Sequence, residues 1–296
     1  MRLARVRATA YPKLTLSLHV LGARDDGFHE IEGLVVSLGQ PHDVVEVYAV
    51  PAPGGVQLEL MGEQIERVPD DHTNLAFVAA EKLMVRAGRS GHGVRLVLRK
   101  RIPTGGGLGG GSADAAAALL AVRRLLDVDI DDAGVHDIAA EVGSDVPFCL
   151  TGGSAWIRGR GERVEALAIP RGLGFLVAVP PFRLSTPAVY HAWDALGGPR
   201  STREVEAPRR IAPILATFRN DLEPAAEAVE PSLGDFRRAL ERATGRPALL
   251  AGSGSAYVVP VNDVRVLPEL VDRVGRKLRV PVAGTTTVTR GVRLGV

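Results

Sequence analysis

Apolar and polar residues alternate near the start of the chain, which is the pattern of a β-strand with one buried face. Leu14, Leu16 and Leu18 fall on one side of the segment 4–20, and Lys13 falls on the other. Alternation or short apolar runs return later in the chain and predict further strands. These strands are expected at residues 31–38, 44–50, 54–60, 93–103, 151–167, 172–179 and 286–294.

Elsewhere the apolar positions recur every three or four residues, which predicts amphipathic helices. Residues 73–86 show this spacing, with Asp71 or Thr73 as the expected N-cap. Two further helices are expected over residues 115–126 and 132–142. Later helices are expected to begin near residues 186, 220, 231 and 264.

A glycine-rich stretch joins one predicted strand to one predicted helix: residues 103–120 read PTGGGLGGGSADAAAALL. Glycine lets backbone amides approach a ligand closely, and the first amides of a helix have no partner within the helix. Ser112 and Asp114 are the expected caps of that helix. Because free amides and the helix dipole together favour an anion, the stretch is interpreted as a phosphate cradle.

Two other interpretations of the glycine stretch compete with the cradle. Gly105, Gly107 and Gly110 satisfy G-x-G-x-x-G, a weak signal shared with dinucleotide-binding oxidoreductases, although that fingerprint normally follows the first strand of its fold. A flexible linker would be rich in glycine and serine and would not run straight into a strong helix. The stretch lacks the lysine of a Walker A loop, so any cation must come from elsewhere.

Length and composition narrow the class of protein. The 296 residues are enough for two domains, and 46% hydrophobic with 24% charged residues is ordinary for a soluble globular protein. A net charge of +2 from interspersed basic and acidic residues predicts no nucleic-acid partner. The single cysteine, Cys149, excludes an internal disulfide. No apolar stretch reaches the ~20 residues of a membrane helix and no signal peptide is evident, so we expect a cytoplasmic protein without membrane contact.

The residues also suggest a chemistry for the cradle. Phosphoryl transfer needs charge neutralisation and a group that takes the proton of the acceptor. Mg²⁺ held by phosphate oxygens and a hydroxyl such as that of Ser112 would neutralise charge. An aspartate beside a lysine would take the proton, and Lys13 and Asp145 are candidates for this pair. The residues therefore indicate a nucleotide-dependent phosphotransferase whose acceptor is open.

Three segments resemble the signature motifs of the GHMP kinases: YPKLTLSL at 11–18, PTGGGLGGGSADAAA at 103–117 and AGSGSAYVV at 251–259. Shorter segments resemble the branch of that family that phosphorylates a cytidine diphosphate-linked methylerythritol in the non-mevalonate route to isoprenoids. These segments are DGFHE at 26–30, GSDVPF at 143–148, GRGE at 159–162 and NDLE at 220–223. They occur in the family's order over most of the chain, which makes the resemblance specific.

The resemblance implies an α+β protein of two domains with the active site in the cleft between them. Residues 1–160 would form a ribosomal-protein-S5-like ATP-binding domain, and residues 161–296 a ferredoxin-like domain. It further implies ATP and Mg²⁺ as cofactors and a small-molecule acceptor that carries a cytidine diphosphate. The protein is expected to be a monomer or a homodimer.

The resemblance also assigns roles to individual positions. Asp145 matches the base that acts on the acceptor hydroxyl, and Lys13 matches the cation that supports it. The ATP phosphates are expected to lie against Pro103, Gly105, Gly106, Gly107, Leu108, Gly109, Gly110, Gly111 and Ser112.

The acceptor is expected at a second group of positions. His29 matches the residue that reads the cytosine edge, and Phe28 and Tyr190 match aromatic residues on either side of the cytosine ring. Thr186 matches a position near the methylerythritol.

Some positions depart from the family's usual residues, and other functions stay open. Thr15 stands where the family usually has asparagine, Phe28 replaces the commoner tyrosine, and Gly106 replaces a frequent alanine. One alternative is another GHMP kinase, acting on mevalonate, homoserine or a sugar. A second is a nucleotide-binding relative without turnover, against which the presence of both Lys13 and Asp145 argues.

Overall fold

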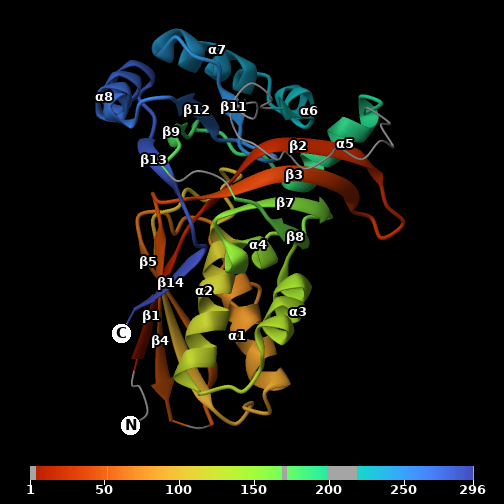
Figure 1. Ribbon diagram of the computed structural model, residues 1–296, viewed down its shortest axis with the longest axis vertical. Helices are drawn as coiled ribbons and strands as arrows, with labels where there is room; N and C mark the ends of the chain where they lie inside the picture. The colour runs from red at the N-terminus through yellow and green to blue at the C-terminus, as the bar shows by residue number, and fades with distance from the viewer. Residues whose placement is uncertain (1–4, 52, 169–171, 199–218, 296) are drawn as a thin grey trace.

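Two β-sheets organise the protein in the computed structural model, which describes residues 5–51, 53–168, 172–198 and 219–295 (Figure 1). The first sheet has the strand order β14-β1-β4-β6-β5. Its strands are β1 (Arg5–Ala10), β4 (Asp43–Val50), β5 (Gly55–Gly62), β6 (Gly93–Lys100) and β14 (Val292–Gly295). Alternate residues of β6 face inward, and Val94, Leu96 and Leu98 are fully buried, as the period of two predicts.

Three helices pack beside this first sheet in the lower half of Figure 1. They are α1 (Leu75–Arg86), α2 (Gly110–Leu125) and α3 (Asp132–Val142). The inner face of α2 consists largely of alanine, and Ala115, Ala118 and Ala121 have no exposed surface. Small side chains let α2 lie close to α1, β1 and β4. This packing fixes the position of the first turn of α2, which follows the glycine stretch.

The second sheet runs through β10-β2-β3-β13-β9-β12-β11, and β7 pairs with both β3 and β8. Its strands are β2 (Lys13–Ala23), β3 (His29–Leu38), β7 (Ser154–Gly159), β8 (Arg163–Ala166), β9 (Gly174–Ala178), β10 (Arg219–Asn220), β11 (Leu249–Leu250), β12 (Tyr257–Val261) and β13 (Val282–Val288). The helices associated with it are α4 (Val146–Thr151), α5 (Thr186–Ala195), α6 (Glu223–Val229), α7 (Ser232–Thr244) and α8 (Leu267–Leu278), with a 3₁₀ turn at Val264–Val266. In Figure 1, α6, α7 and α8 lie at the top, beyond β9, β11 and β12.

Both sheets contain strands from each side of residue 160. In the first sheet, β14 pairs antiparallel with β1. In the second sheet, β13 pairs antiparallel with β3, and β10 pairs parallel with β2. The division into residues 1–160 and 161–296 stays a prediction.

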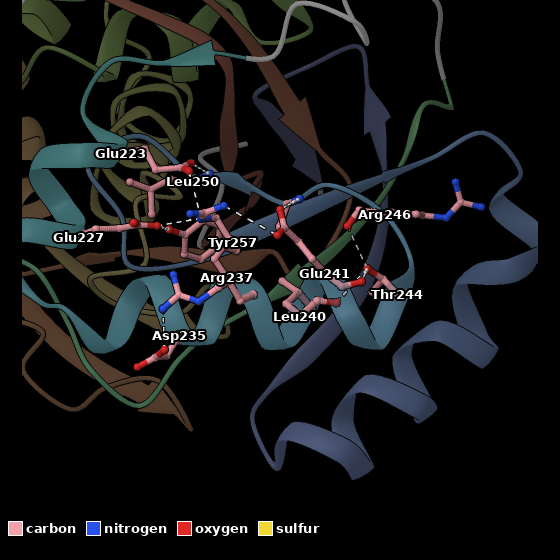
Figure 2. Close-up of polar contacts among 12 residues, drawn as sticks. Glu223, Glu227, Asp235, Arg237, Leu240, Glu241, Thr244, Arg246, Leu250 and Tyr257 are labelled. Carbon is pink, nitrogen blue, oxygen red and sulfur yellow. Dashed lines mark hydrogen bonds and ion pairs between the residues drawn. The ribbon is translucent and has the colours of Figure 1, made fainter.

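A polar network around Arg237 joins α6 and α7 to the strands beside them (Figure 2). Arg237 Nε lies 2.8 Å from Glu227 Oε1 and 3.3 Å from Glu223 Oε1. Glu223 Oε2 accepts a hydrogen bond from the backbone N–H of Leu250 at 3.3 Å, and Glu227 accepts one from the Tyr257 hydroxyl at 3.4 Å. Leu250 and Tyr257 flank residues 251–256, the C-terminal glycine turn, so this network holds both ends of the turn in place.

The strand-rich segment predicted over 4–20 forms β1 and β2, with a break at Tyr11 and Pro12, because proline lacks the N–H that a ladder requires. The single strand predicted over 286–294 is wrong, since β13 ends at Val288 in the second sheet and β14 begins at Val292 in the first.

The predicted cap of α1 is also wrong. Asn74 is the N-cap, and its side chain accepts a hydrogen bond from the N–H of Ala76 at 2.9 Å. Asp71 instead accepts from the N–H of Thr73 at 2.9 Å in the preceding turn. None of the helices in the described ranges is both long and apolar enough to cross a bilayer.

Candidate active site

The glycine stretch leads into α2 through a left-handed residue. Gly109 is the N-cap of α2 with φ of 68°, and no side chain caps the helix. The prediction that Ser112 and Asp114 cap this helix is therefore wrong, because α2 begins at Gly110 and both residues lie inside it. The first N–H groups of α2 are left without side-chain acceptors, as an anion site requires.

Two glycines of the stretch are required by close packing. A Cβ on Gly107 would lie 1.9 Å from the carbonyl oxygen of Ala251, and a Cβ on Gly109 would lie 2.7 Å from Lys13 Cγ. Both residues also have positive φ, which side-chain-bearing residues rarely adopt. The glycine stretch therefore lies directly between Lys13 and the C-terminal glycine turn.

Backbone hydrogen bonds tie the glycine stretch to both of these neighbours. The N–H of Lys13 donates to the carbonyl oxygen of Leu108 at 3.0 Å. From the C-terminal turn, the N–H of Ser255 donates to the carbonyl oxygen of Gly105 at 3.3 Å. The three segments that resemble the family motifs thus meet at one place, although they are far apart in the sequence.

Lys13 and Asp145 meet beside the glycine stretch. Lys13 Nζ lies 3.3 Å from Asp145 Oδ2, and it also donates to the hydroxyl of Thr15 at 3.3 Å. The Lys13 side chain is 10% exposed, whereas the Asp145 side chain is 36% exposed. Asp145 precedes α4 but makes no capping hydrogen bond, so its carboxylate is available to a ligand.

One cavity of about 870 Å³ contains every residue that the sequence analysis assigned to the site. Lys13 and Asp145 line it together with the glycine stretch. The predicted acceptor residues Phe28, His29, Thr186 and Tyr190 line it as well. The structure brings these positions together, and their individual roles stay predictions.

His29 lines the cavity and has well-defined partners. Its Nε2 lies 2.9 Å from Asp194 Oδ1, and its ring centroid lies 4.7 Å from that of Tyr190 and 5.6 Å from that of Trp193. Phe28 is 46% exposed and does not share these contacts. The sequence analysis did not identify Asp194, because a lone aspartate on a helix carries no signal of a partner that distant in sequence.

Tyr190 and Thr186 both belong to α5. Burial, aided by the negative charge of Asp145, raises the pKa of the Tyr190 hydroxyl above its ordinary value. The Tyr190 hydroxyl is therefore protonated at neutral pH, and Tyr190 and Asp145 line the same cavity. The hydroxyl of Thr186 lies 2.8 Å from that of Ser253 in the C-terminal glycine turn, so α5 and this turn are in direct contact.

The sequence analysis missed a buried charge cluster of Lys100, Asp43 and Asp114 beside the end of the glycine stretch. Lys100 forms ion pairs with Asp43 and Asp114, and all three residues are buried. Asp43 Oδ1 accepts from the N–H of Ile102 at 2.8 Å, whereas Asp114 Oδ1 has no hydrogen-bond partner among the described residues. Lys100 continues the inward-facing positions of β6, and this charge at an apolar position was the available signal.

The cluster shifts the pKa values of its members. Burial raises the pKa of the Asp114 carboxyl, and the Lys100 ammonium opposes that shift. Burial acts to lower the pKa of Lys100, but the two carboxylates outweigh it and the pKa is raised. The cluster links β4 and β6 to α2 just after the first turn of that helix, and Lys100 and Asp114 also line the cavity.

Little in the described ranges could hold a metal ion through protein groups alone. No group of three or more His, Cys, Asp and Glu side chains there has the arrangement of a metal site. Ser112 lies in the first turn of α2 and lines the cavity, so its hydroxyl is available to a cation carried by a ligand. This arrangement fits a metal that arrives with phosphate oxygens.

The sequence is similar to known proteins over most of its length. Residues 74–153 match the family model of the GHMP kinases N terminal domain. The chain is 40% identical over 255 residues to the 4-diphosphocytidyl-2-C-methyl-D-erythritol kinase of Pelotomaculum thermopropionicum, which covers 84% of this chain and 86% of the relative. The kinase of the same name from Streptomyces coelicolor is 38% identical, with 86% of each chain covered.

Solved structures of kinases are also similar to this chain. A crystal structure of 4-(cytidine 5'-diphospho)-2C-methyl-D-erythritol kinase matches with a TM-score of 0.75 at 32% identity, over 95% of this chain and 98% of that chain. A homoserine kinase from Cytophaga hutchinsonii shares the fold with a TM-score of 0.72 at 18% identity, over 99% of this chain and 98% of that chain. The predicted α+β fold and the family resemblance are both confirmed.

Proposed function

Because the chain belongs to the 4-diphosphocytidyl-2-C-methyl-D-erythritol kinases within the GHMP kinase family, we propose that it transfers the γ-phosphoryl group of ATP to the 2-hydroxyl of that acceptor. The product would feed the non-mevalonate route to isoprenoid precursors. The acceptor is a small molecule, and ATP use follows from membership of the family.

The observation that supports this proposal best is the meeting of Lys13 with Asp145 beside the glycine stretch. An ammonium 3.3 Å from a carboxylate, in a cavity that also contains the free amides of a helix start, combines a cation, a base and an anion site. These are the groups that phosphoryl transfer to a hydroxyl requires.

Asp145 acts as the general base in this proposal. One of its oxygens accepts the proton of the acceptor hydroxyl while that hydroxyl attacks the γ-phosphorus. Lys13, whose Nζ lies 3.3 Å from that carboxylate, holds it in place and stabilises the negative charge that develops on the transferred group. Thr15 accepts a hydrogen bond from the Lys13 ammonium at 3.3 Å and so helps to orient it. The Thr15 hydroxyl therefore contacts Lys13, one member of the proposed catalytic pair.

The glycine stretch binds the phosphates of ATP in this proposal. Gly105, Gly107 and Gly109 all have positive φ and line the cavity, and such a backbone can present its N–H groups to an anion. The N–H groups at the start of α2 add the positive end of a helix dipole. Mg²⁺ bound to the phosphates neutralises charge, and the Ser112 hydroxyl is the protein group we propose as its ligand.

The opposite end of the cavity binds the cytidine of the acceptor. We propose that the base lies between Phe28 and Tyr190, that His29 contacts its polar edge, and that Thr186 lies near the methylerythritol. Asp194 holds His29 through Nε2 and thereby fixes the orientation of its ring. The cavity is bounded by residues from both proposed domains, 1–160 and 161–296, with Lys13 from the first and Tyr190 from the second.

A panel of acceptors tests this function directly. Purified protein is incubated with ATP and Mg²⁺ and with 4-diphosphocytidyl-2-C-methyl-D-erythritol, mevalonate, homoserine or galactose in turn. Release of ADP measures turnover, and ³¹P and ¹³C NMR of the product locate the new phosphate. We expect turnover with the first acceptor alone and a phosphate on its 2-hydroxyl. Faster turnover with any other acceptor, or a phosphate on a different hydroxyl, would refute the proposal.

A further inference from the structure

Asn220, the last residue of β10, joins the strand that carries Lys13 to the C-terminal glycine turn. Its backbone belongs to the second sheet, where β10 pairs parallel with β2 and Asn220 lies opposite Leu18. The N–H of the next residue, Asp221, donates to the carbonyl oxygen of Leu18 at 3.1 Å. Because β2 begins at Lys13, the backbone of Asn220 is held against the strand of the proposed catalytic lysine.

The side chain of Asn220 is bonded to the glycine turn through both of its N–H groups. Nδ2 donates to the carbonyl oxygen of Leu250 at 2.9 Å and to that of Gly252 at 2.6 Å. Oδ1 accepts from the N–H of Leu222 at 3.0 Å, which fixes the orientation of the amide. Asparagine is the shortest side chain that offers two donors and an acceptor, so aspartate cannot replace these bonds. Asn220 therefore clamps the backbone on both sides of Ala251.

The clamped backbone lies against both Lys13 and the glycine stretch. A Cβ on Gly252 would lie 3.4 Å from Lys13 Nζ and 3.4 Å from the carbonyl oxygen of Gly107. The carbonyl oxygen of Ala251, between the two clamped carbonyls, is the atom that a Cβ on Gly107 would meet at 1.9 Å. Gly252 also lines the cavity. The position of this backbone thus limits where the Lys13 ammonium can lie.

The Lys13 ammonium depends on such packing because its polar contacts are long. Its Nζ lies 3.3 Å from Asp145 Oδ2 and 3.3 Å from the Thr15 hydroxyl. A strong charge-assisted hydrogen bond would measure about 2.7 to 2.9 Å. Lysine carries its charge on a flexible four-carbon stem, so contacts of this length leave its position to the groups packed around it. Gly109 packs against the stem, and Gly252 packs against the ammonium.

We propose that Asn220 is a positioning residue for phosphoryl transfer, which acts by holding Gly252 against the Lys13 ammonium. The inference rests on the proposed function, because it takes Lys13 as the cation that supports Asp145. Asn220 lies outside the described lining of the cavity, so it is not expected to touch ATP or the acceptor. Its loss should therefore slow the chemical step and leave the binding of both ligands nearly unchanged.

The experiment measures steady-state kinetics and urea unfolding of wild type, Asn220→Ala and Asn220→Asp. Alanine removes both donors, whereas ionised aspartate keeps the shape but turns a second acceptor toward two carbonyl oxygens. Thr244→Val is the matched control, because the buried Thr244 hydroxyl donates to the carbonyl oxygen of Leu240 within α7 at 2.9 Å. This control also removes a structural hydrogen bond to a backbone carbonyl, but from a residue outside the glycine turn.

Both Asn220 variants should lower kcat by at least about tenfold, as expected when a catalytic group is displaced by a fraction of an ångström. Their KM values for ATP and for the acceptor should stay within about twofold of wild type. Thr244→Val should unfold at a lower urea concentration, as the Asn220 variants do, but keep the wild-type kcat. A purely structural role of Asn220 would lower stability in the same way without this loss of kcat.

A second comparison shows whether the effect passes through Lys13. Single-turnover rates are measured in Lys13→Met and in the double variant Lys13→Met with Asn220→Ala. Without the ammonium there is nothing for the clamp to position, so Asn220→Ala should slow the residual transfer by less than about twofold. If the two losses multiply in full, Asn220 acts on another part of the site and the inference is overturned.

Folded Asn220 variants with the wild-type kcat, or a loss that appears only in KM, would also overturn the inference. In either case, wild-type turnover with 4-diphosphocytidyl-2-C-methyl-D-erythritol would keep the proposed function intact. Wild-type protein that phosphorylates a different acceptor would instead overturn the proposed function. The comparison of Asn220 variants would then be made with that acceptor, and the same loss of kcat would support the role of Asn220.

Discussion

Replacing Gly109 with alanine should lower kcat strongly and the free energy of unfolding only slightly. This glycine packs against Lys13 and is also the N-cap of α2. Gly109 has φ of 68°, and a Cβ there would lie 2.7 Å from Lys13 Cγ and 3.2 Å from Lys13 Cε. Ordinary contact begins at about 3.4 Å, so the middle of the Lys13 side chain must move by roughly 0.7 Å. The Lys13 side chain is buried and cannot simply turn toward solvent.

Two magnitudes follow from this geometry. Alanine in a left-handed conformation costs about 1 to 2 kcal/mol, so Gly109→Ala should lower the free energy of unfolding by about that amount. A displacement of a catalytic group by about 1 Å can cost about 100-fold in rate, so we expect kcat to fall by roughly that factor. The KM for ATP should change much less, because the other amides of the stretch are retained.

Steady-state kinetics and urea unfolding of the same preparations provide the assay. Gly275→Ala is the matched control, because this glycine lies within α8 and a Cβ there would meet nothing within 4 Å. The control should gain about 0.5 to 1 kcal/mol in unfolding free energy, since alanine is the better helix residue, and keep the wild-type kcat. A Gly109→Ala enzyme with kcat within twofold of wild type would refute the argument that Gly109 positions Lys13.

Two further predictions concern stability. Lys100→Met leaves two buried carboxylates without their cation and should cost about 3 to 5 kcal/mol in urea unfolding at neutral pH, against less than about 0.5 kcal/mol for the exposed Lys277→Met. Burial raises the pKa of the Asp114 carboxyl and the Lys100 ammonium opposes that rise, so without Lys100 the folded protein should bind a proton at Asp114 more readily. The loss should therefore shrink as pH falls, and a loss independent of pH would contradict the assignment. Burial lowers the pKa of His19 from its ordinary 6.5, against the opposing charge of Asp221. The folded protein therefore binds fewer protons, and stability should fall as pH drops through that value. His19→Gln should lose less stability than wild type between about pH 7.5 and about pH 5.5, and an equal loss in both would contradict this reasoning.

Local patterns in the sequence predicted the parts of the site that lie within one segment. Glycines followed at once by alanines predicted a loop that enters a helix, and the structure has this loop between β6 and α2. The helix start is two residues earlier than Ser112, because Gly109 can adopt the left-handed conformation and so end the loop itself. A side-chain cap is then unnecessary, which the residue types alone did not reveal.

Contacts between distant segments were predicted only where the family motifs named both partners. Lys13 and Asp145 are one such pair, and the structure places them 3.3 Å apart. Lys100 and its two aspartates come from β4, β6 and α2, and the inward-facing position of Lys100 in β6 was a local signal that did not identify its partners. Burial and partner are properties of the assembled sheet and helix, so they follow from the sequence only after the packing is known.

The same limit applies to Arg160. Its motif marked the family branch, but the sequence does not show whether an arginine in a glycine turn faces a carboxylate, water or a ligand. The structure shows that Arg160 lines the cavity with its guanidinium over the Phe28 ring, and that the Glu162 carboxylate accepts a hydrogen bond from its backbone N–H.

The most direct test of the account is a single-turnover measurement on Asp145→Asn. Asparagine keeps the size and the hydrogen-bonding capacity of the side chain but cannot accept the proton of the acceptor hydroxyl. With ATP, Mg²⁺ and 4-diphosphocytidyl-2-C-methyl-D-erythritol, we predict phosphoryl transfer slower than wild type by about 100-fold or more and an ATP dissociation constant within about threefold of wild type. Transfer at close to the wild-type rate would contradict the central claim that Asp145, held by Lys13 beside the glycine stretch, is the base.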